Sequence, residues 1–435
     1  MNLVPGFIVL LQALAPTMTT PTFESFVTVV TGWVFSGRGT ITRSILSAGG
    51  LATKHFSSYH RLFSAAQWSL DAVGLAVFDL IEPWLGEMIM LGVDDTLARK
   101  RGLKIFGVGM HHDPLRSTRS RPVTSWGLSW VSLGVIVRLP FRPGHNYYLP
   151  LLFRLYQNKA AAAKSRRTYR SRPELAVDLL HLLCNQRKAR RFHVVADSAY
   201  GGQSVLCNLP ENCGITSRLT LTTRLYDPPP APEQGHRGRP RIRGNRLPSP
   251  AELLEGRCRR VALDIYGRCQ KARVADCIAR VHAAPARPLR VVATEAIGGG
   301  RGVEVFYSTC ADATAEQVIG QYASRWSIEV AYRDVKQSLG FEQPQGWCRK
   351  TVERTAPIAM LIYSLVIIWF AREGHRHWQP ADHAWYATKR DPSFADMLAE
   401  LKRRSIRGCI FSLPFDTMGP RKLFRILENA VNLAA

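Results

Sequence analysis

The sequence lacks the patterns that mark several common classes of protein. Its nine cysteines are odd in number and include no Cys-x-x-Cys pair, so neither a disulfide framework nor a zinc ribbon is indicated, and we expect a reducing, cytoplasmic setting. No basic residue precedes the apolar N-terminal segment, which is untypical of a secretory signal. The apolar run over residues 355–371 has 17 residues, at the lower edge for a membrane span, so we expect a buried core helix and no membrane contact.

Acidic residues are also scarce. The 435 residues include 58 Lys and Arg but only 33 Asp and Glu, which gives a net charge of +25. A chain that holds so much like charge together normally has a polyanionic partner, and nucleic acid is the leading candidate. With 46% hydrophobic residues the chain is too apolar to stay unfolded, and its length fits two or three domains.

The pattern of apolar residues divides the chain into five regions. Up to about residue 85 it is helical, and the two short helices around Gly49 and Gly50 fit either a helix-turn-helix DNA reader or an ordinary helical hairpin. Apolar strands and a helix follow, which favours a mixed α/β sheet covered by helices. The expected regions are a helical, DNA-binding domain over 1–85, the first part of a core over 86–221, a β-rich insertion over 222–310, the completion of the core over 311–372, and C-terminal helices over 373–435.

The predicted insertion opens with a stretch rich in proline, glycine and arginine. Residues 224–250 cannot form a regular element, so we expect a flexible basic loop there, with Arg239 and Arg241 in contact with the phosphate backbone of DNA. Alternating, strand-like segments follow. The helical pattern resumes near residue 312, where Asp312 or Thr314 is placed to cap the new helix.

Carboxylates occupy positions where catalytic residues are common. Asp94 and Asp95 end one apolar run, Asp197 follows a second, and Glu329 lies inside the late helix. The carboxyl ends of strands are the usual place for functional side chains in α/β sheets. Aspartate and glutamate without a His/Cys cluster suit Mg²⁺ or Mn²⁺, and a pair of such ions cleaves phosphodiesters. Taken singly, each acid is more often a cap or turn residue.

The helix around Glu329 has an unusual face. Tyr322, Arg325, Glu329, Arg333 and Lys336 fall within about 80° of one another at about 100° per residue. Arg325 precedes Glu329, the less favourable order for an ion pair four residues apart, and the cations outnumber the acid. A metal-binding carboxylate with cations above and below it to hold phosphates explains this face better than a solvated surface does.

These residues carry a resemblance to a known family. The spacing Tyr-(2)-Arg-(3)-Glu-(6)-Lys, met by Tyr322, Arg325, Glu329 and Lys336, resembles the signature of DDE transposases from bacterial insertion sequences. The sequences VDDT and VVADSAYGG look like the two aspartate motifs of that family. The predicted insertion also falls where this group places its own β-rich insertion, between the second aspartate and the glutamate.

The resemblance implies an RNase H-like catalytic core and a set of metal ligands. Asp95, Asp197 and Glu329 would bind two Mg²⁺ ions, with Mn²⁺ as a substitute. We prefer Asp95 to Asp94 because the matching aspartate of the family lies next to the threonine. Since side chains alternate along a strand, only one of the two should reach the metals.

The resemblance also implies DNA contacts. By this resemblance, Tyr322, Arg325 and Lys336 would position the DNA end. From their charge and position alone, we expect Arg333 on the same helix face and the basic cluster of Lys100, Arg101 and Lys104 to contact the DNA backbone as well. Trp326 and Trp347 are candidates for stacking on a flipped base, although a core position is favoured for both. His111 and His112 are expected to be surface loop residues.

Together these features predict a DNA transposase. It would cut the ends of its own element and join them to target DNA, as a homodimer that bridges two double-stranded ends. Two alternatives stay open: a structure-selective nuclease on the same fold, and a remnant that only binds DNA.

Overall fold

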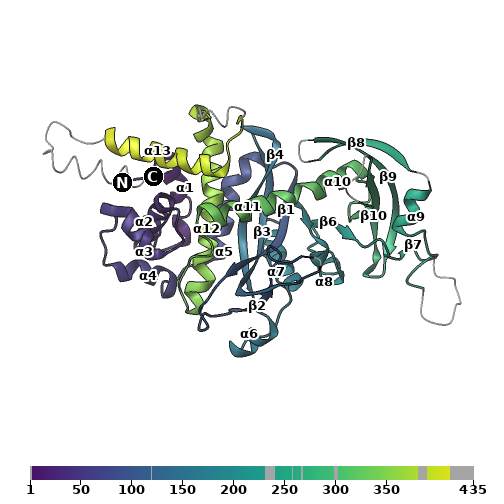
Figure 1. The fold of residues 1–435 in the computed structure, drawn as a ribbon, viewed down its shortest axis with the longest axis horizontal. Helices are drawn as coiled ribbons and strands as arrows, with labels where there is room; N and C mark the ends of the chain where they lie inside the picture. Colours follow the sequence, from purple (N-terminus) through teal and green to yellow (C-terminus); the bar gives the residue numbers. More distant parts are fainter. Residues whose placement is uncertain are drawn as a thin grey trace.

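The computed structural model describes residues 2–118, 120–230, 241–256, 258–265, 268–297, 302–380 and 389–411. The chain begins with the expected group of helices, of which the first four lie at the left of the molecule in Figure 1 and the fifth lies beside the sheet. They are α1 (Pro5–Gln12), α2 (Thr20–Ser36), α3 (Ile41–Ala48), α4 (Phe56–Ser64) and α5 (Leu70–Ile81). The break between α3 and α4 passes through Gly49 with φ +56°, a left-handed conformation that favours glycine.

Five strands form the central part of the sheet. They are β1 (Met88–Arg99), β3 (Thr124–Leu139), β4 (Arg142–Tyr156), β5 (Arg191–Ala196) and β6 (Cys213–Leu219), with the short β2 (Gly109–His112) beside β3. Their order is β4-β3-β1-β5-β6; β1, β5 and β6 run parallel, while β3 pairs antiparallel with both β1 and β4. This mixed sheet is the one expected of an RNase H-like core.

The region between β6 and the late helices is mostly β, as its alternating pattern indicates. It contains β7 (Leu225–Tyr226), α9 (Pro250–Glu255), β8 (Arg259–Ile265), β9 (Arg268–Val281), β10 (Ala284–Ala296) and β11 (Glu304–Ser308). Strand β11 pairs antiparallel with β6, so core and insertion share one 11-stranded sheet. Arg239 lies outside the described residues.

Helices cover the central sheet, and one of them runs through the interior. The helices are α6 (Lys159–Lys164), α7 (Arg172–Gln186), α8 (Gln203–Leu206), α10 (Ala315–Ser324), α11 (Trp326–Ser338), α12 (Arg349–Arg372) and α13 (Phe394–Phe411). Helix α12 stands between the first four N-terminal helices and the sheet in Figure 1, while α5 packs directly on β4. Helix α12 is long and apolar enough to cross a membrane, but its most apolar stretch is entirely buried inside the protein, as expected of a core helix.

The structure corrects three details of the sequence interpretation. Strand β1 does not end at Asp94 and Asp95 but continues to Arg99, because β3 remains paired with it. The long strand β4 was not predicted, since its two prolines are unfavourable within a strand. The late helical stretch is divided at Arg325 into α10 and α11, and Thr314, not Asp312, caps α10.

Candidate active site

The register of the sheet brings two of the predicted acids together. Strands β1 and β5 are parallel neighbours whose pairing ends at Val93 and Ala196. Asp94 is the next residue of β1 and Asp197 directly follows β5, so the two acids lie side by side where the pairing of these strands ends. Asp197 caps the short 3-10 helix Ser198–Tyr200, and its carboxylate accepts a hydrogen bond from the Ala199 amide at 2.9 Å.

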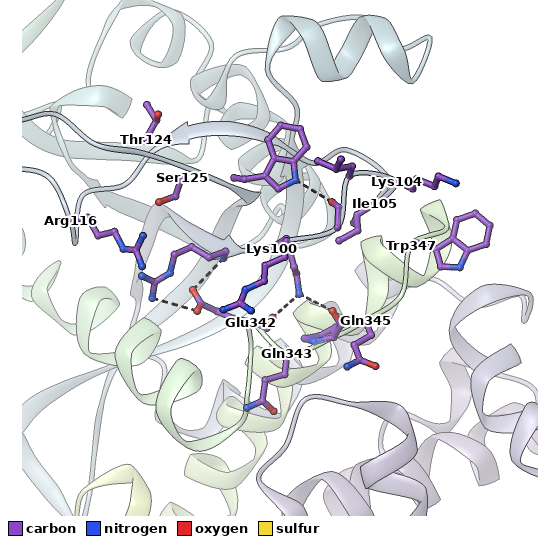
Figure 2. Close-up of a pocket in the computed structure, with 16 residues that line it drawn as sticks. Lys100, Lys104, Ile105, Arg116, Thr124, Ser125, Glu342, Gln343, Gln345 and Trp347 are labelled. Carbon is purple, nitrogen blue, oxygen red and sulfur yellow. Dashed lines mark hydrogen bonds and ion pairs between the residues drawn. The ribbon is translucent and has the colours of Figure 1, made fainter.

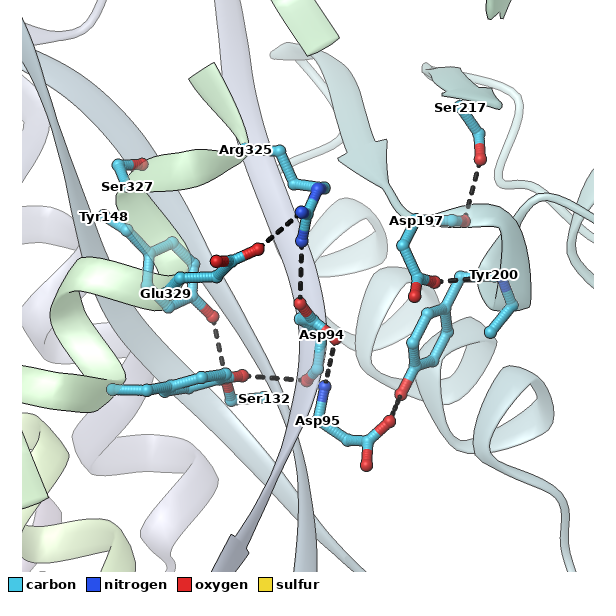
Figure 3. A network of polar contacts seen from close by, with 12 residues as sticks. Asp94, Asp95, Ser132, Tyr148, Asp197, Tyr200, Ser217, Arg325, Ser327 and Glu329 are labelled. Atoms are coloured by element: carbon cyan, nitrogen blue, oxygen red, sulfur yellow. Dashed lines mark hydrogen bonds and ion pairs between the residues drawn. The ribbon is translucent and has the colours of Figure 1, made fainter. Parts of the chain in front are cut away.

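Arg325 connects Asp94 to Glu329. The guanidinium Nη1 lies 3.1 Å from Asp94 Oδ2, and Nη2 lies 2.6 Å from Glu329 Oε1. The side chains of Arg325 and Asp94 are only 17% and 16% exposed, so solvent screens this network weakly. Figure 3 shows the guanidinium between the two carboxylates, with Asp197 on the facing element. The residues predicted from the helix face and from the two strands therefore meet at one place.

The electrostatics of this cluster favour a bound cation. Burial, together with the neighbouring Asp95 and Asp197, raises the pKa of Asp94 to about 7, although Arg325 opposes the shift. Burial also raises the pKa of Asp197. Burial makes the charged forms of these two acids unfavourable, and a bound divalent cation would stabilise those charged forms. Carboxylate oxygens are hard ligands, which Mg²⁺ prefers.

The ligands are not assembled around one point. Among the described residues no three His, Cys, Asp or Glu side chains are grouped closely enough to hold one ion. The reason lies in the network itself, because the Arg325 guanidinium stands between Asp94 and Glu329. The donor set fits divalent metal ions by its chemistry, and the side chains would have to turn toward the ion.

Asp95 has a different set of partners. Its carboxylate accepts a hydrogen bond from Tyr200 Oη at 2.8 Å and from Ser129 Oγ at 3.2 Å, and Arg172 Nε lies 3.0 Å away. Arg172 also stacks on the Tyr156 ring, 4.1 Å from its centroid. Asp95 is close enough for its charge to act on Asp94 and Asp197, whereas Asp94 is the aspartate paired with Arg325. Our preference for Asp95 as the metal ligand therefore stays a prediction, with Asp94 as its alternative.

A buried set of hydroxyl groups holds α11 against β1. Tyr332 Oη donates to the Asp94 carbonyl at 2.9 Å and lies 2.7 Å from Ser132 Oγ, which in turn lies 2.8 Å from Tyr148 Oη. Sequence analysis did not single out Tyr332, Arg172 or Tyr200. Only the position of Tyr332, three residues after Glu329 on the same helix, offered a signal.

The residues predicted to contact DNA differ in burial and in their partners. Tyr322 lies under Arg325, with the guanidinium carbon 5.8 Å from the ring centroid. Arg333 is largely exposed and pairs with Asp334 at 3.1 Å, while Lys336 is only 19% exposed and lies 3.8 Å from Glu342. Arg101, Lys104 and Arg241 are exposed.

Lys100 is held by the protein itself. Its Nζ donates to the carbonyls of Glu342 and Pro344 at 2.7 and 2.8 Å, and burial lowers its pKa to about 8. Lys100 therefore holds the loop that follows α11 in place, in addition to any contact that it makes with DNA.

Three sequence expectations about single side chains are wrong. Trp326 and Trp347 are 50% and 69% exposed and do not belong to the core. His111 is not a surface residue but is 4% exposed on β2, where burial lowers its pKa to about 4; its neighbour His112 is exposed.

Fold and site together define a class of metal-dependent enzyme that acts on phosphodiesters. Residues 13–275, more than half of the chain, match the family of DDE superfamily endonucleases. The chain belongs to this family, whose members use divalent metal ions, typically Mg²⁺, and act on DNA. The match includes Asp94, Asp95 and Asp197 and ends before Glu329, so the role of Glu329 rests on its position beside Arg325. No curated protein matches the chain.

Proposed function

We propose that this endonuclease is a DNA transposase, which cuts the ends of its own element and joins them to target DNA. The observation that carries the proposal is the convergence of Asp94 and Asp197, from adjacent strands, with Glu329 from α11 around Arg325. The net charge of +25 supports a partner as anionic as DNA.

The proposed ligands of two Mg²⁺ ions, for which Mn²⁺ would substitute, are Asp197, Glu329 and either Asp95 or its alternative Asp94. When bound, such ions activate a water or a 3′-hydroxyl and stabilise the leaving oxygen. The other residues position these acids. Tyr332 holds α11 on β1, and Arg172 and Tyr200 keep Asp95 in place on the same strand.

Arg325 has two roles in this proposal. In the free protein it pairs with both Asp94 and Glu329 and offsets part of their negative charge. Where Asp94 is the ligand from β1, Asp94 and Glu329 would hold the metal ions, and the Arg325 guanidinium would then be free to bind a phosphate of the DNA. Tyr322, Arg333, Lys336, Arg101, Lys104 and Arg241 are proposed as further backbone contacts. We further propose that the protein acts in the bacterial cytoplasm as a homodimer that bridges the two ends of the DNA element.

The test is an assay of purified protein with Mg²⁺ on DNA that carries the flanking ends of its own gene. We expect wild type to cut at the ends and join them to a target. Glu329→Gln and Asp197→Asn should abolish both steps while specific DNA binding persists. Asp178→Asn is a matched control, because Asp178 is a surface acid paired with Arg170; it should leave cleavage unchanged. EDTA should stop the reaction, and added Mn²⁺ should restore it.

Other outcomes would replace the proposal. Cleavage without joining indicates a structure-selective nuclease on the same fold. Binding without cleavage, in both wild type and Asp197→Asn and with Mn²⁺ also tried, indicates a remnant that only binds DNA. Loss of folding in Glu329→Gln would show that this glutamate is structural.

A further inference from the structure

A large basic groove lies at the end of β1, five residues beyond Asp94. It has a volume of about 1380 Å³ and is formed by the segment that ends β1 and by the loop after α11, with Arg99, Lys100, Arg101, Lys104 and Arg116 along its wall. Figure 2 shows the nitrogen-bearing side chains around its centre and Trp347 at its side. Among the described residues that line the groove, Glu342 is the one acid.

The walls of the groove are tied together. Lys100 Nζ donates to the carbonyls of Glu342 and Pro344, the Phe106 amide donates to the Trp347 carbonyl at 2.9 Å, and Trp126 Nε1 donates to the Gly102 carbonyl at 3.1 Å. These bonds fix the two segments relative to each other. A groove whose walls are already ordered loses little entropy when a ligand enters it.

Glu342 lies among three cations, and its carboxylate accepts a hydrogen bond from the Arg99 backbone amide at 3.4 Å. Its carboxylate is 3.6 Å from Arg99 Nη2 and 3.8 Å from Lys336 Nζ, and Lys100 is its third charged neighbour. Charge-assisted N–H···O bonds are normally about 2.7–2.9 Å long. The distances from this carboxylate to the side chains of Arg99 and Lys336 are therefore longer than those of close ion pairs. A phosphate oxygen at the same place would face the same cations.

The groove lies within reach of DNA bound at the acidic cluster. Lys336 follows Glu329 by seven residues of α11, about 10 Å at 1.5 Å per residue. Arg99 follows Asp94 by five residues of β1, about 16 Å at 3.3 Å per residue. With roughly 3.4 Å between nucleotides along a strand, these distances correspond to about three to five nucleotides.

We propose that this groove binds the phosphate backbone of DNA and that Glu342 occupies the place of a phosphate, which limits the affinity. This inference rests on the proposed function, because the path of the DNA from the acidic cluster to the groove assumes cleavage at that cluster. It concerns the binding of DNA and adds no chemical step. A DNA phosphate that enters the groove competes with Glu342 for Arg99 and Lys336. Removal of the glutamate charge therefore strengthens DNA binding.

The experiment compares Glu342→Gln with Glu82→Gln in the full-length chain. Both variants raise the net charge by one, and Glu82 also lies 3.8 Å from an arginine, Arg190, but outside the groove. Binding of a labelled duplex without metal is measured by fluorescence anisotropy at several salt concentrations. We expect Glu342→Gln to bind roughly 3- to 10-fold tighter and its log–log salt slope to steepen by about 0.9, the value for one added phosphate contact. Glu82→Gln should change the affinity less than twofold.

Equal behaviour of the two variants would overturn the proposal, as would weaker binding by Glu342→Gln with an unchanged melting temperature. If Glu342→Gln does not fold, Arg99→Gln takes its place: it should weaken binding and flatten the salt slope, and unchanged binding refutes the groove. None of these measurements requires cleavage, so failure of the groove and failure of the transposase proposal are distinguishable.

Discussion

Replacement of Asp94 by asparagine should stabilise the metal-free protein, by an amount that grows from about pH 4 and is largest above about pH 7. The folded-state pKa of Asp94, about 7, lies above its ordinary value of 3.8, so the folded protein binds this proton more tightly than the unfolded chain does. Stability is therefore lost as pH rises from about 4, and the loss is complete above about 7. At about 1.4 kcal/mol per pH unit, the full loss is about 4 kcal/mol.

Asparagine is uncharged and has nearly the same shape, so it stands in for the protonated acid. In EDTA, Asp94→Asn should raise the melting temperature by several degrees at pH 8 and leave it unchanged at pH 4. Asp95→Asn is the control. It removes the ion pair with Arg172 at 3.0 Å and should bring no such gain at pH 8. A difference between wild type and Asp94→Asn that does not depend on pH would refute the reasoning.

Two further predictions concern the attachment of the N-terminal helices. Trp33 Nε1 donates to the buried Leu339 carbonyl at 2.8 Å; Trp33→Phe leaves that carbonyl unpaired and should lower the free energy of unfolding by about 1–3 kcal/mol, measured by urea denaturation. Arg354 on α12 donates to the carbonyls of Ala66 and Trp68 at 2.9 and 2.8 Å. Arg354→Met should cost on the order of 3 kcal/mol and expose the N-terminal helices to early proteolysis, and an unchanged digestion pattern would contradict this role.

The sequence indicated which acids the fold brings near one another, but not how their side chains are arranged. Asp197 and Glu329 could be chosen because one follows an apolar strand and the other lies on a face of cations. The choice between Asp94 and Asp95 depends on which side of β1 faces α11, and that side is set by pairing with β3 and β5. Such register is a property of the whole sheet and is not encoded in the four letters VDDT.

Other features had no local signal at all. Arg172 is the first residue of α7 and looks like any arginine at a helix start, yet it is paired with Asp95. Lys100 resembled its exposed neighbours Arg101 and Lys104, but the loop after α11 covers it. Contacts between segments far apart in the chain decide both roles, 77 residues apart for Arg172 and Asp95 and more than 240 for Lys100 and the loop after α11. A pattern within one segment cannot contain them.

The continuous sheet limits how this chain can be shortened. Strand β6 is bonded to β5 on one side and to β11 on the other, so the insertion closes what would be the open edge of the core. A core trimmed of residues 222–310 would present a row of free amides and carbonyls along β6. Such an edge is a template for pairing with another copy, and the trimmed core would aggregate. By pairing with β6, the insertion thus prevents edge-to-edge association between copies of the chain, whether or not it also contacts DNA.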